Sequence, residues 1–387
     1  MIFDLPDLPP IYQSVVDRVI ELRNQLRFAT SDNLNRWKGF TARLAYASAI
    51  HQSNAMEGIN ATFQDAVAVV DDEPPAGPAD ENWKALTGYR DAMDYVIQLA
   101  HSKSPFRHNP QTLNALHFMV TKYDLTKSPG QFRVGSVRVE NSETHDIVYE
   151  GPDAELVPSL VDELIDYLVS SSNGHVLCKA AMAHLNLTMI HPWRDGNGRM
   201  ARILQTFILA QEGILDPRFS SIEEYVGRNS SYYYRVLSEV GQGQWNPHHS
   251  SLPWIKFCLR AHYWQAESLL RRVAQSAVLW KALEEEATRH GLPQRVVNAL
   301  MSAAYQIKVQ NPSYRQESGV STQVAKLDLR NMVAAGLLEP RGEKRGRYYV
   351  PSKKLQDLRN DSKIPQSPTD PFDEEEKAQR PFFANEG

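Results

Sequence analysis

One segment constrains the fold of this chain more than any other: the glycine-rich loop HPWRDGNGRMAR, from His191 to Arg202, lies between two helical stretches. Residues 175–189 before it and residues 198–211 after it carry apolar side chains at helical spacing. Pro192 stops the first helix from continuing through the preceding residue. The sequence therefore predicts two helices joined by a tight loop, with the loop at the start of the second helix.

Most of the remaining chain also has helical periodicity. The other predicted helices cover residues 11–28, 36–56, 85–99, 112–123, 154–169, 232–241 and 253–290. Residues 129–151 differ, because apolar and polar residues alternate on both sides of the turn sequence NSET. We therefore expect a mainly α fold that contains one β-hairpin.

Four segments are expected along the chain. An N-terminal helical region covers residues 1–100, a central domain that contains the glycine-rich loop covers 101–270, and a winged-helix-like domain covers 271–358. The winged-helix prediction rests on two helical stretches followed by the basic hairpin RGEKRGRYYV. Residues 359–387 are rich in Pro, Asp, Glu and Lys and poor in aliphatic residues, so we expect disorder there.

Composition excludes several classes of protein. The formal net charge of -4 gives no global basic field for nucleic acid, and only two cysteines exclude a disulfide framework. The N-terminus lacks the pattern of a signal peptide, and no apolar run is long enough to span a membrane. No zinc, Walker or dinucleotide pattern is present. We expect a cytoplasmic protein that does not bind membranes.

The loop has the chemistry of a phosphate site. Its glycines leave backbone N–H groups open beside a helix N-terminus, which favours anions. His191 can exchange a proton near neutral pH, and Asp195 offers a hard oxygen ligand for Mg²⁺. Arg199 and Arg202 are three residues apart, so they share a helix face from which both can reach phosphates.

The loop resembles the motif of the Fic family, H-P-F-x-D/E-G-N-G-R-x-x-R, with Trp193 in place of the usual Phe. The resemblance extends over roughly residues 40–265. It implies a Fic-type helical domain that transfers AMP from ATP to a Ser, Thr or Tyr hydroxyl of a protein, itself included. In that reaction His191 would deprotonate the hydroxyl, and Asp195 would hold Mg²⁺ against the phosphates.

The resemblance also implies the contacts to ATP. The backbone amides of Gly196, Asn197 and Gly198 and the side chain of Asn197 would bind phosphate oxygens. Arg199 would bind the β-phosphate region, and Arg202 the γ-phosphate. The segment SYYYRVL resembles the family's YY-x-x-L, so Tyr233 or Tyr234 could lie against adenine; core packing of these tyrosines is the alternative.

The stretch SNAMEGIN carries a second pattern. Ser53 and Glu57 are four residues apart and share one helix face, and Gly58 follows where a helix could end. This resembles the inhibitory motif of Fic proteins, S/T-x-x-x-E-G/N. It implies that Glu57 pairs with Arg202 and misaligns ATP while Ser53 supports the contact. A surface glutamate on an ordinary helix is the alternative.

The hairpin resembles the family's flap, because it precedes the loop at about the same distance and opens with GQFR, similar to G-x-Y/F-R. A flap would bind the target protein as an added strand. Val139, Asn141 and His145 are candidate clamps for that segment. A purely structural hairpin is the alternative.

Other functions stay open at this point. The wing carries Arg341, Lys344, Arg345 and Arg347, so the C-terminal domain could bind DNA, another protein or a second copy of the chain. A DNA-binding regulator that uses the Fic domain as a nucleotide sensor is therefore one alternative. A bifunctional enzyme, in which Glu57 aligns a water that removes AMP, is another. The complete set of residues in the loop favours an enzyme.

Overall fold

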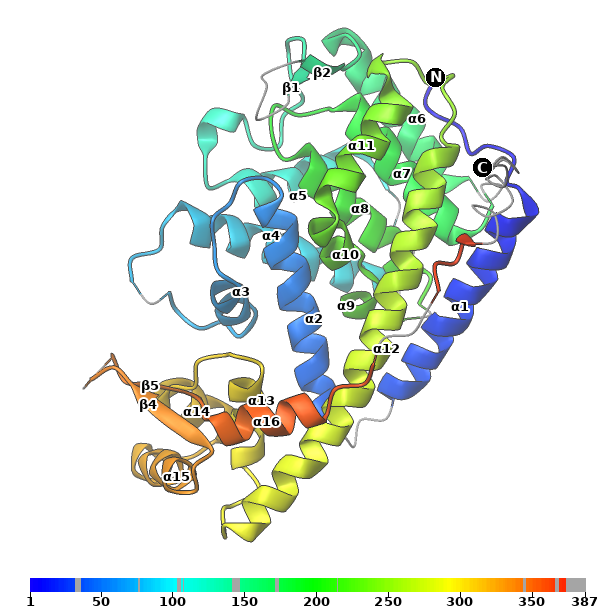
Figure 1. The fold of residues 1–387 in the computed structure, drawn as a ribbon. Helices are drawn as coiled ribbons and strands as arrows, with labels where there is room; N and C mark the ends of the chain where they lie inside the picture. The colour runs from blue at the N-terminus through cyan, green and yellow to red at the C-terminus, as the bar shows by residue number, and fades with distance from the viewer. Residues whose placement is uncertain are drawn as a thin grey trace, which may run out of the picture. The chain divides into compact units, whose positions relative to one another are not determined.

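The computed structural model of the chain describes residues 1–31, 36–75, 77–102, 106, 108–140, 147–170, 174–213, 215–343, 346–365 and 369–373. Helices dominate, as the apolar periodicity predicts. The chain divides into two compact units: Met1–Phe28, Ala45–Ser268 and Pro368–Gly387 form the first, and Ala29–Leu44 with Leu269–Ser367 form the second. Helices α1 (Pro10–Ser31), α2 (Arg36–Ala55) and α12 (Leu252–Arg289) contribute residues to both (Figure 1).

Helix α8 forms the centre of the first unit, packed against α4, α5, α7 and α9 (Figure 1). Both α7 and α8 are buried around most of their circumference. Small and aliphatic residues predominate in α7, whereas α8 also buries the polar side chains of Arg199, Arg202 and Gln205. Besides its parts of α1, α2 and α12, the described residues of this unit form the helices α3 (Phe63–Val70), α4 (Glu81–Ala100), α5 (Pro110–Thr121), η1 (Leu125–Lys127), η2 (Ala154–Leu156), α6 (Val157–Val169), α7 (Val176–Ile190), α8 (Asn197–Gln211), α9 (Pro217–Ser220), α10 (Glu223–Arg228) and α11 (Ser230–Gly241).

A small sheet lies beside the end of α7. Strands β1 (Arg138–Glu140) and β2 (Ile147–Glu150) are antiparallel, and β2 pairs in parallel with β3 (Gly243–Gln244). The Tyr149 hydroxyl donates to the carbonyl oxygen of Met189 at 2.7 Å, which fixes the hairpin to α7.

The hairpin is shorter than its alternating pattern predicts, because residues 131–137 form no strand. In that segment the side chain of Arg133 turns inward and binds backbone carbonyls. The candidate clamps Asn141 and His145 lie outside the described residues, whereas Val139 lies in β1.

The second unit contains three helices followed by a hairpin and a last helix. They are α13 (Val296–Ala304), α14 (Asn311–Ser318), α15 (Thr322–Ala334), β4 (Leu338–Arg341), β5 (Tyr348–Pro351) and α16 (Lys353–Asp361). The buried Asp328 joins two of these helices, because it accepts from the Tyr314 hydroxyl at 2.8 Å and pairs with Arg295 at 2.7 Å. The winged-helix assignment stays a prediction, and Lys344 and Arg345 of the wing lie outside the described residues.

Two of the expected segments pack with other parts of the first unit. Helix α4, within the expected N-terminal helical region, packs on α8 and buries Leu86 and Tyr89. The segment from residue 359 is partly ordered: α16 continues through Asp361, and Phe372 is fully buried with its ring 5.1 Å from that of Tyr12. Residues 374–387 lie outside the described part of the chain.

None of the helices in the described residues has both the length and the apolar character that crossing a bilayer requires.

Candidate active site

His191 ends helix α7 in a left-handed backbone conformation, with φ +52° and ψ +59°. Such a conformation costs a residue other than glycine about 1–2 kcal/mol. The Nδ1 atom lies 3.2 Å from the carbonyl oxygen of Thr188. Because a carbonyl only accepts hydrogen bonds, Nδ1 carries the proton and Nε2 carries a lone pair. No hydrogen bond from a described residue engages Nε2.

The charge state of His191 also suits a base. Burial lowers its pKa, and the nearby charge of Arg133 lowers it further, while Thr188, Glu57 and Asp195 act in the opposite direction. Because the net shift is downward from 6.5, the imidazole is neutral at pH 7. It can therefore accept a proton from a substrate hydroxyl placed at Nε2.

Arg133, the arginine of GQFR, fixes the backbone around His191. Its Nε donates to the carbonyl oxygen of His191 at 2.8 Å, and its terminal nitrogens donate to Gly135 at 2.7 Å and to Pro152 at 2.5 Å. Its own backbone N–H donates to Pro192 at 2.9 Å. The sequence identified this residue only as part of a flap motif, whereas the structure makes it a support of the catalytic loop.

Asn197 closes the loop on itself. Its Oδ1 accepts from the backbone N–H of Trp193 at 3.0 Å, and its Nδ2 donates to the Trp193 carbonyl at 2.8 Å. The side chain was expected to contact phosphate; instead both of its polar atoms are engaged within the loop. Trp193 is anchored in turn by its indole N–H, which donates to Asn114 at 2.9 Å.

His117 on α5 supports the loop from the other side, which the sequence did not predict. Its ring stacks on Trp193 with centroids 4.6 Å apart. The backbone N–H of Gly130 donates to Nδ1 at 2.8 Å, so Nε2 carries the proton and donates to the Asp195 carbonyl at 2.9 Å. Burial lowers the pKa of His117 to about 4, so this arrangement stays neutral at pH 7.

Gly196 must be glycine for two reasons. Its φ is +80°, and a Cβ atom there would lie 2.8 Å from the side chain of Thr121. Its backbone N–H donates to Oδ1 of Asp195 at 2.7 Å, so this expected phosphate contact is engaged within the loop.

The first turn of α8 offers an anion site. Among the described residues, none accepts a hydrogen bond from the backbone amides of Asn197, Gly198 and Arg199. These three amides and the positive end of the helix dipole favour a negatively charged group at this position. The three open amides therefore begin one residue later than the predicted set of Gly196, Asn197 and Gly198.

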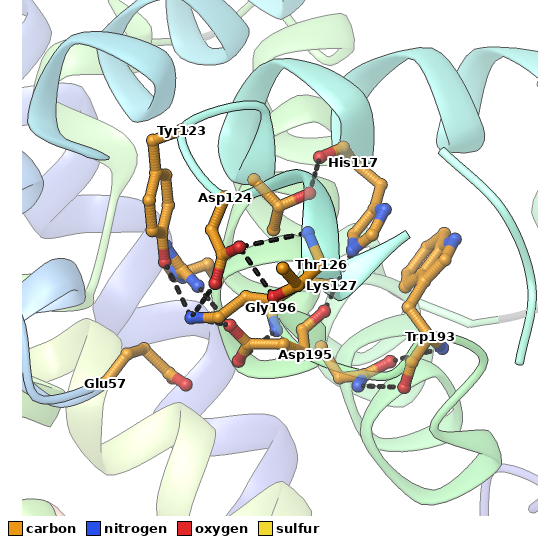
Figure 2. Close-up of polar contacts among 12 residues, drawn as sticks. Glu57, His117, Tyr123, Asp124, Thr126, Lys127, Trp193, Asp195 and Gly196 are labelled. Atoms are coloured by element: carbon orange, nitrogen blue, oxygen red, sulfur yellow. Dashed lines mark hydrogen bonds and ion pairs between the residues drawn. The ribbon is translucent and has the colours of Figure 1, made fainter. Parts of the chain in front are cut away.

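Asp195 carries a salt bridge that the sequence did not predict. Its Oδ2 lies 2.7 Å from Nζ of Lys127 and 3.4 Å from a terminal nitrogen of Arg199 (Figure 2). Burial alone would raise the pKa of Asp195, but the hydrogen bond from Lys127 and the charges of Arg199 and Lys127 lower it. The carboxylate is therefore ionised at pH 7.

The donor set around Asp195 fits Mg²⁺ only together with a nucleotide. Among the described residues, no three or more His, Cys, Asp or Glu side chains gather to form a metal site. Mg²⁺ commonly binds through one or two carboxylates while water and substrate phosphates supply the other ligands. The cation already beside Asp195, the ammonium of Lys127, shows that this carboxylate accepts a positive charge.

Arg202 is buried in α8 and pairs with the segment that carries Ser53 and Glu57. Its Nε donates to the Ser53 hydroxyl at 2.7 Å, and one terminal nitrogen donates to the Ser53 carbonyl at 3.0 Å and to Glu57 at 2.7 Å. The other terminal nitrogen is buried without a hydrogen-bond partner in the described part of the chain. Burial opposes the charge of Arg202, but Glu57 together with Tyr233 and Tyr89 outweighs burial and raises the pKa of the guanidinium.

Glu57 occupies the edge of the anion site. A Cβ atom at Gly198 would lie only 2.4 Å from Oε1 of Glu57, so the carboxylate rests directly against the first turn of α8. Ser53 and Glu57 were expected to share one face of a helix. Helix α2 instead ends at Ala55, two residues before Glu57, and Glu57 lies in the turn that follows. Gly58 completes that turn with φ +79°.

The two candidate tyrosines have different surroundings. Tyr233 is buried, and its hydroxyl lies 3.1 Å from Nε2 of the buried His184, so it cannot present a face to adenine. Tyr234 is 48% exposed, and its hydroxyl donates to the Met56 carbonyl at 3.2 Å beside Glu57. Of this pair only Tyr234 stays a candidate for a nucleotide contact.

Residues 107–209 match the Fic/DOC family. The chain is 25% identical over 248 residues to a protein adenylyltransferase Fic of Nematostella vectensis, which covers 63% of this chain and 54% of that protein. It is 27% identical over 209 residues to a protein adenylyltransferase Fic of Drosophila willistoni, which covers 52% of this chain and 38% of that protein. The chain thus spans about half or less of the length of these curated relatives.

Solved structures of Fic proteins have a similar fold. A Fic family protein from Desulfovibrio desulfuricans G20 aligns with a TM-score of 0.59 at 21% identity, covering 90% of this chain and 98% of that one. A Fic domain containing signaling protein from Bacteroides thetaiotaomicron aligns with a TM-score of 0.53 at 18% identity, covering 68% and 96%. The loop from His191 to Arg202 lies within the residues that match the Fic/DOC family.

Proposed function

We propose that this chain transfers AMP from ATP to a Ser, Thr or Tyr hydroxyl of a protein, itself included, and that Glu57 restrains the reaction. The observation that carries the proposal is the free lone pair on Nε2 of His191 at the end of a loop that leads into an anion site. The relatives named protein adenylyltransferase support the same chemistry.

In the proposed reaction His191 removes the proton from the target hydroxyl. The hydroxyl oxygen then forms a bond to the α-phosphorus of ATP, and the bond from that phosphorus to the pyrophosphate oxygen breaks. The proton passes to Nε2, and pyrophosphate leaves as the second product. Positioning and charge neutralisation supply most of the rate, as in other phosphoryl-transfer enzymes.

The residues that would bind ATP follow from their positions. The free amides of Asn197 and Gly198 would donate to phosphate oxygens at the first turn of α8. Arg199 would neutralise the β-phosphate region. Arg202 would bind the γ-phosphate, a role that suits its buried nitrogen without a partner. Mg²⁺ at Asp195 would neutralise phosphate charge beside these groups.

Glu57 would act as a brake because it takes up two of the groups that ATP needs. It pairs with Arg202 at 2.7 Å and lies against Gly198 at the anion site. ATP can then bind only with its γ-phosphate displaced, so the α-phosphate is misaligned relative to His191. Ser53 supports the brake because it holds Arg202 in the orientation that meets Glu57.

The target protein would bind along strand β1. In the described residues the sheet has the order β1-β2-β3, so β1 has no neighbour on its outer edge. An extended segment can add there through main-chain hydrogen bonds. The open edge of β1 supports it as the proposed docking site for the segment that carries the modified hydroxyl.

The test is incubation of the Glu57→Gly protein with α-labelled or γ-labelled ATP and Mg²⁺ in a cell lysate. We expect protein-bound label from the α position alone, at a level well above that of the unaltered chain. His191→Ala in the same background should abolish it, because no other group in the loop can take the proton. His101→Ala, which changes an exposed histidine at the end of α4, is the matched control and should leave labelling unchanged.

Other outcomes would reject the proposal in distinct ways. Retention of γ label would indicate kinase chemistry. Equal labelling of the Glu57→Gly and unaltered proteins would remove the brake. No label from either position, together with salt-sensitive retention on DNA, would favour the regulator that uses its Fic domain as a nucleotide sensor.

A further inference from the structure

Lys127 makes the shortest salt bridge to the carboxylate of the catalytic loop. Its Nζ lies 2.7 Å from Oδ2 of Asp195, 3.4 Å from the hydroxyl of Tyr123 and 3.9 Å from Oδ2 of Asp124 (Figure 2). The ammonium also lies 5.1 Å from the centre of the Tyr123 ring. Lys127 is about a third exposed, so the ammonium can move without unfolding its surroundings.

The local sequence builds this position. Asp124 caps the short helix η1 because its Oδ1 accepts from the backbone N–H of Thr126 at 3.0 Å and from the Thr126 hydroxyl at 2.6 Å. Ser128 then reverses the chain with φ +51°. Lys127 is thereby held on a turn between α5 and residues 131–137. From this turn its ammonium reaches Asp195 of the loop while the side chain stays about a third exposed.

The oxygens of Asp195 are already in use. Oδ1 accepts from the backbone N–H of Gly196, and Oδ2 accepts from both Lys127 and Arg199. Two positive charges beside Oδ2 repel a divalent cation and compete with it for this oxygen. The cation gains the full attraction of the carboxylate only when one of the two donors moves away, and Arg199 is fully buried whereas Lys127 is not.

We propose that Lys127 is a positioning residue that competes with the divalent cation for Asp195. This inference rests on the proposed function, because it concerns the metal that accompanies ATP. Without nucleotide, Lys127 holds the carboxylate in place and neutralises it. When ATP brings the metal, the ammonium leaves Oδ2, and the carboxylate of Asp124 and the hydroxyl of Tyr123 remain beside it as partners. Lys127 thus weakens metal binding and restricts it to the nucleotide-bound state.

The test measures metal affinity directly. Mn²⁺ is titrated into Glu57→Gly protein saturated with the α,β-methylene analogue of ATP, and free Mn²⁺ is followed by electron paramagnetic resonance. Lys127→Met and Lys127→Gln should each lower the Kd for Mn²⁺ about tenfold, the order expected for removing one partly exposed charge beside the site. Lys127→Arg, which keeps the charge, should retain the starting affinity.

Two controls separate this effect from others. Lys122→Met removes a lysine that pairs with Asp91 at 3.2 Å, so it changes the net charge equally and should leave the Mn²⁺ affinity unchanged. Asp195→Asn should abolish the affinity gain from Lys127→Met. A purely structural role for Lys127 would lower the melting temperature and the affinity for the metal-free nucleotide, and neither change is expected.

The outcomes distinguish the two proposals. Mn²⁺ binding that depends on Asp195 but is unchanged or weakened in both neutral Lys127 variants overturns the role of Lys127 and leaves the proposed function intact. Absence of nucleotide binding and of Asp195-dependent Mn²⁺ binding in every variant overturns both.

Discussion

Arg133 is the side chain on which the backbone position of His191 most depends. It donates to carbonyl oxygens on both sides of the loop, including that of His191 itself at 2.8 Å. These charge-assisted hydrogen bonds offset the cost of the left-handed conformation at His191. None of its polar contacts involves the anion site.

We therefore expect Arg133→Lys to separate catalysis from nucleotide binding. Lysine keeps the charge but cannot reach three carbonyls in the same geometry. In the Glu57→Gly background, kcat should fall about tenfold or more, because the base loses its alignment with the reacting hydroxyl. The affinity for ATP should change little. Steady-state kinetics and nucleotide titration measure the two quantities.

Arg341→Lys is the matched control for this prediction. Arg341 lies in β4 of the second unit and pairs with Glu339 at 2.9 Å, and both side chains are about half exposed. Such surface pairs contribute little, so kcat should be unaltered. A similar loss of kcat in both variants would contradict the role given to Arg133.

At the scale of single residues, the sequence predicted most of the loop residues but not the side chains that hold the loop in place. His191, Asp195 and the two arginines come from one continuous motif, so their proximity follows from the chain itself. Arg133, His117 and Lys127 bind this loop through backbone carbonyls or through a carboxylate, and each partner is at least 58 positions away in the sequence. No spacing rule records such partners, because only the packed fold brings them together.

At the scale of elements, the end of α2 decides where Glu57, the proposed brake, lies. The helix stops at Ala55, and the following turn carries Glu57 toward α8. Gly58 gives the turn its direction with φ +79°, and no atom lies within 4 Å of where its Cβ would be. Glycine is therefore required here for its backbone conformation and not for space.

Gly58→Ala should weaken the brake without removing Glu57. Alanine in this conformation costs about 1–2 kcal/mol, so the turn will favour other arrangements in which Glu57 leaves Arg202. We expect auto-modification to rise several-fold, yet to remain below that of Glu57→Gly. Incorporation of label from α-labelled ATP measures it.

Gly39→Ala offers the same substitution elsewhere in α2. Gly39 is exposed, lies within the helix and has open space around it, so alanine should stabilise the helix slightly and leave labelling unchanged. If Gly58→Ala labels no more than the unaltered chain, the turn does not control the position of Glu57.

At the scale of the whole molecule, the first unit contains a group of buried neutral histidines. Burial lowers the pKa of His117 to about 4 and those of His184 and His262 to about 3. Gln205 links the last two, with its Oε1 at 2.6 Å from His184 and its Nε2 at 3.1 Å from His262. In the unfolded chain each histidine would titrate near 6.5.

The free energy of unfolding of the first unit should therefore decrease as the pH is lowered. Between about pH 6.5 and the folded pKa of each histidine, the unfolded chain binds protons that the folded chain does not, so the free energy of unfolding decreases as pH falls. In His262→Gln one such site is missing. The difference in unfolding free energy between about pH 7.5 and about pH 5 should then shrink by about 1–2 kcal/mol, measured by urea denaturation.

His248→Gln is the comparison for this experiment. His248 is exposed, so its replacement should leave the pH dependence unchanged. An identical pH dependence in His262→Gln and the unaltered chain would show that the buried histidines do not control acid stability.

The sequence by itself determined the helical class, the helices on either side of the loop and the identity of the loop residues. It could do so because apolar periodicity and glycine conformation are local properties of the chain. Only the tertiary structure decided that Tyr233 is buried, that His117 stacks on Trp193 and that Lys127 lies on Asp195. These facts depend on contacts between distant segments, and such contacts form only when the whole unit packs around α8.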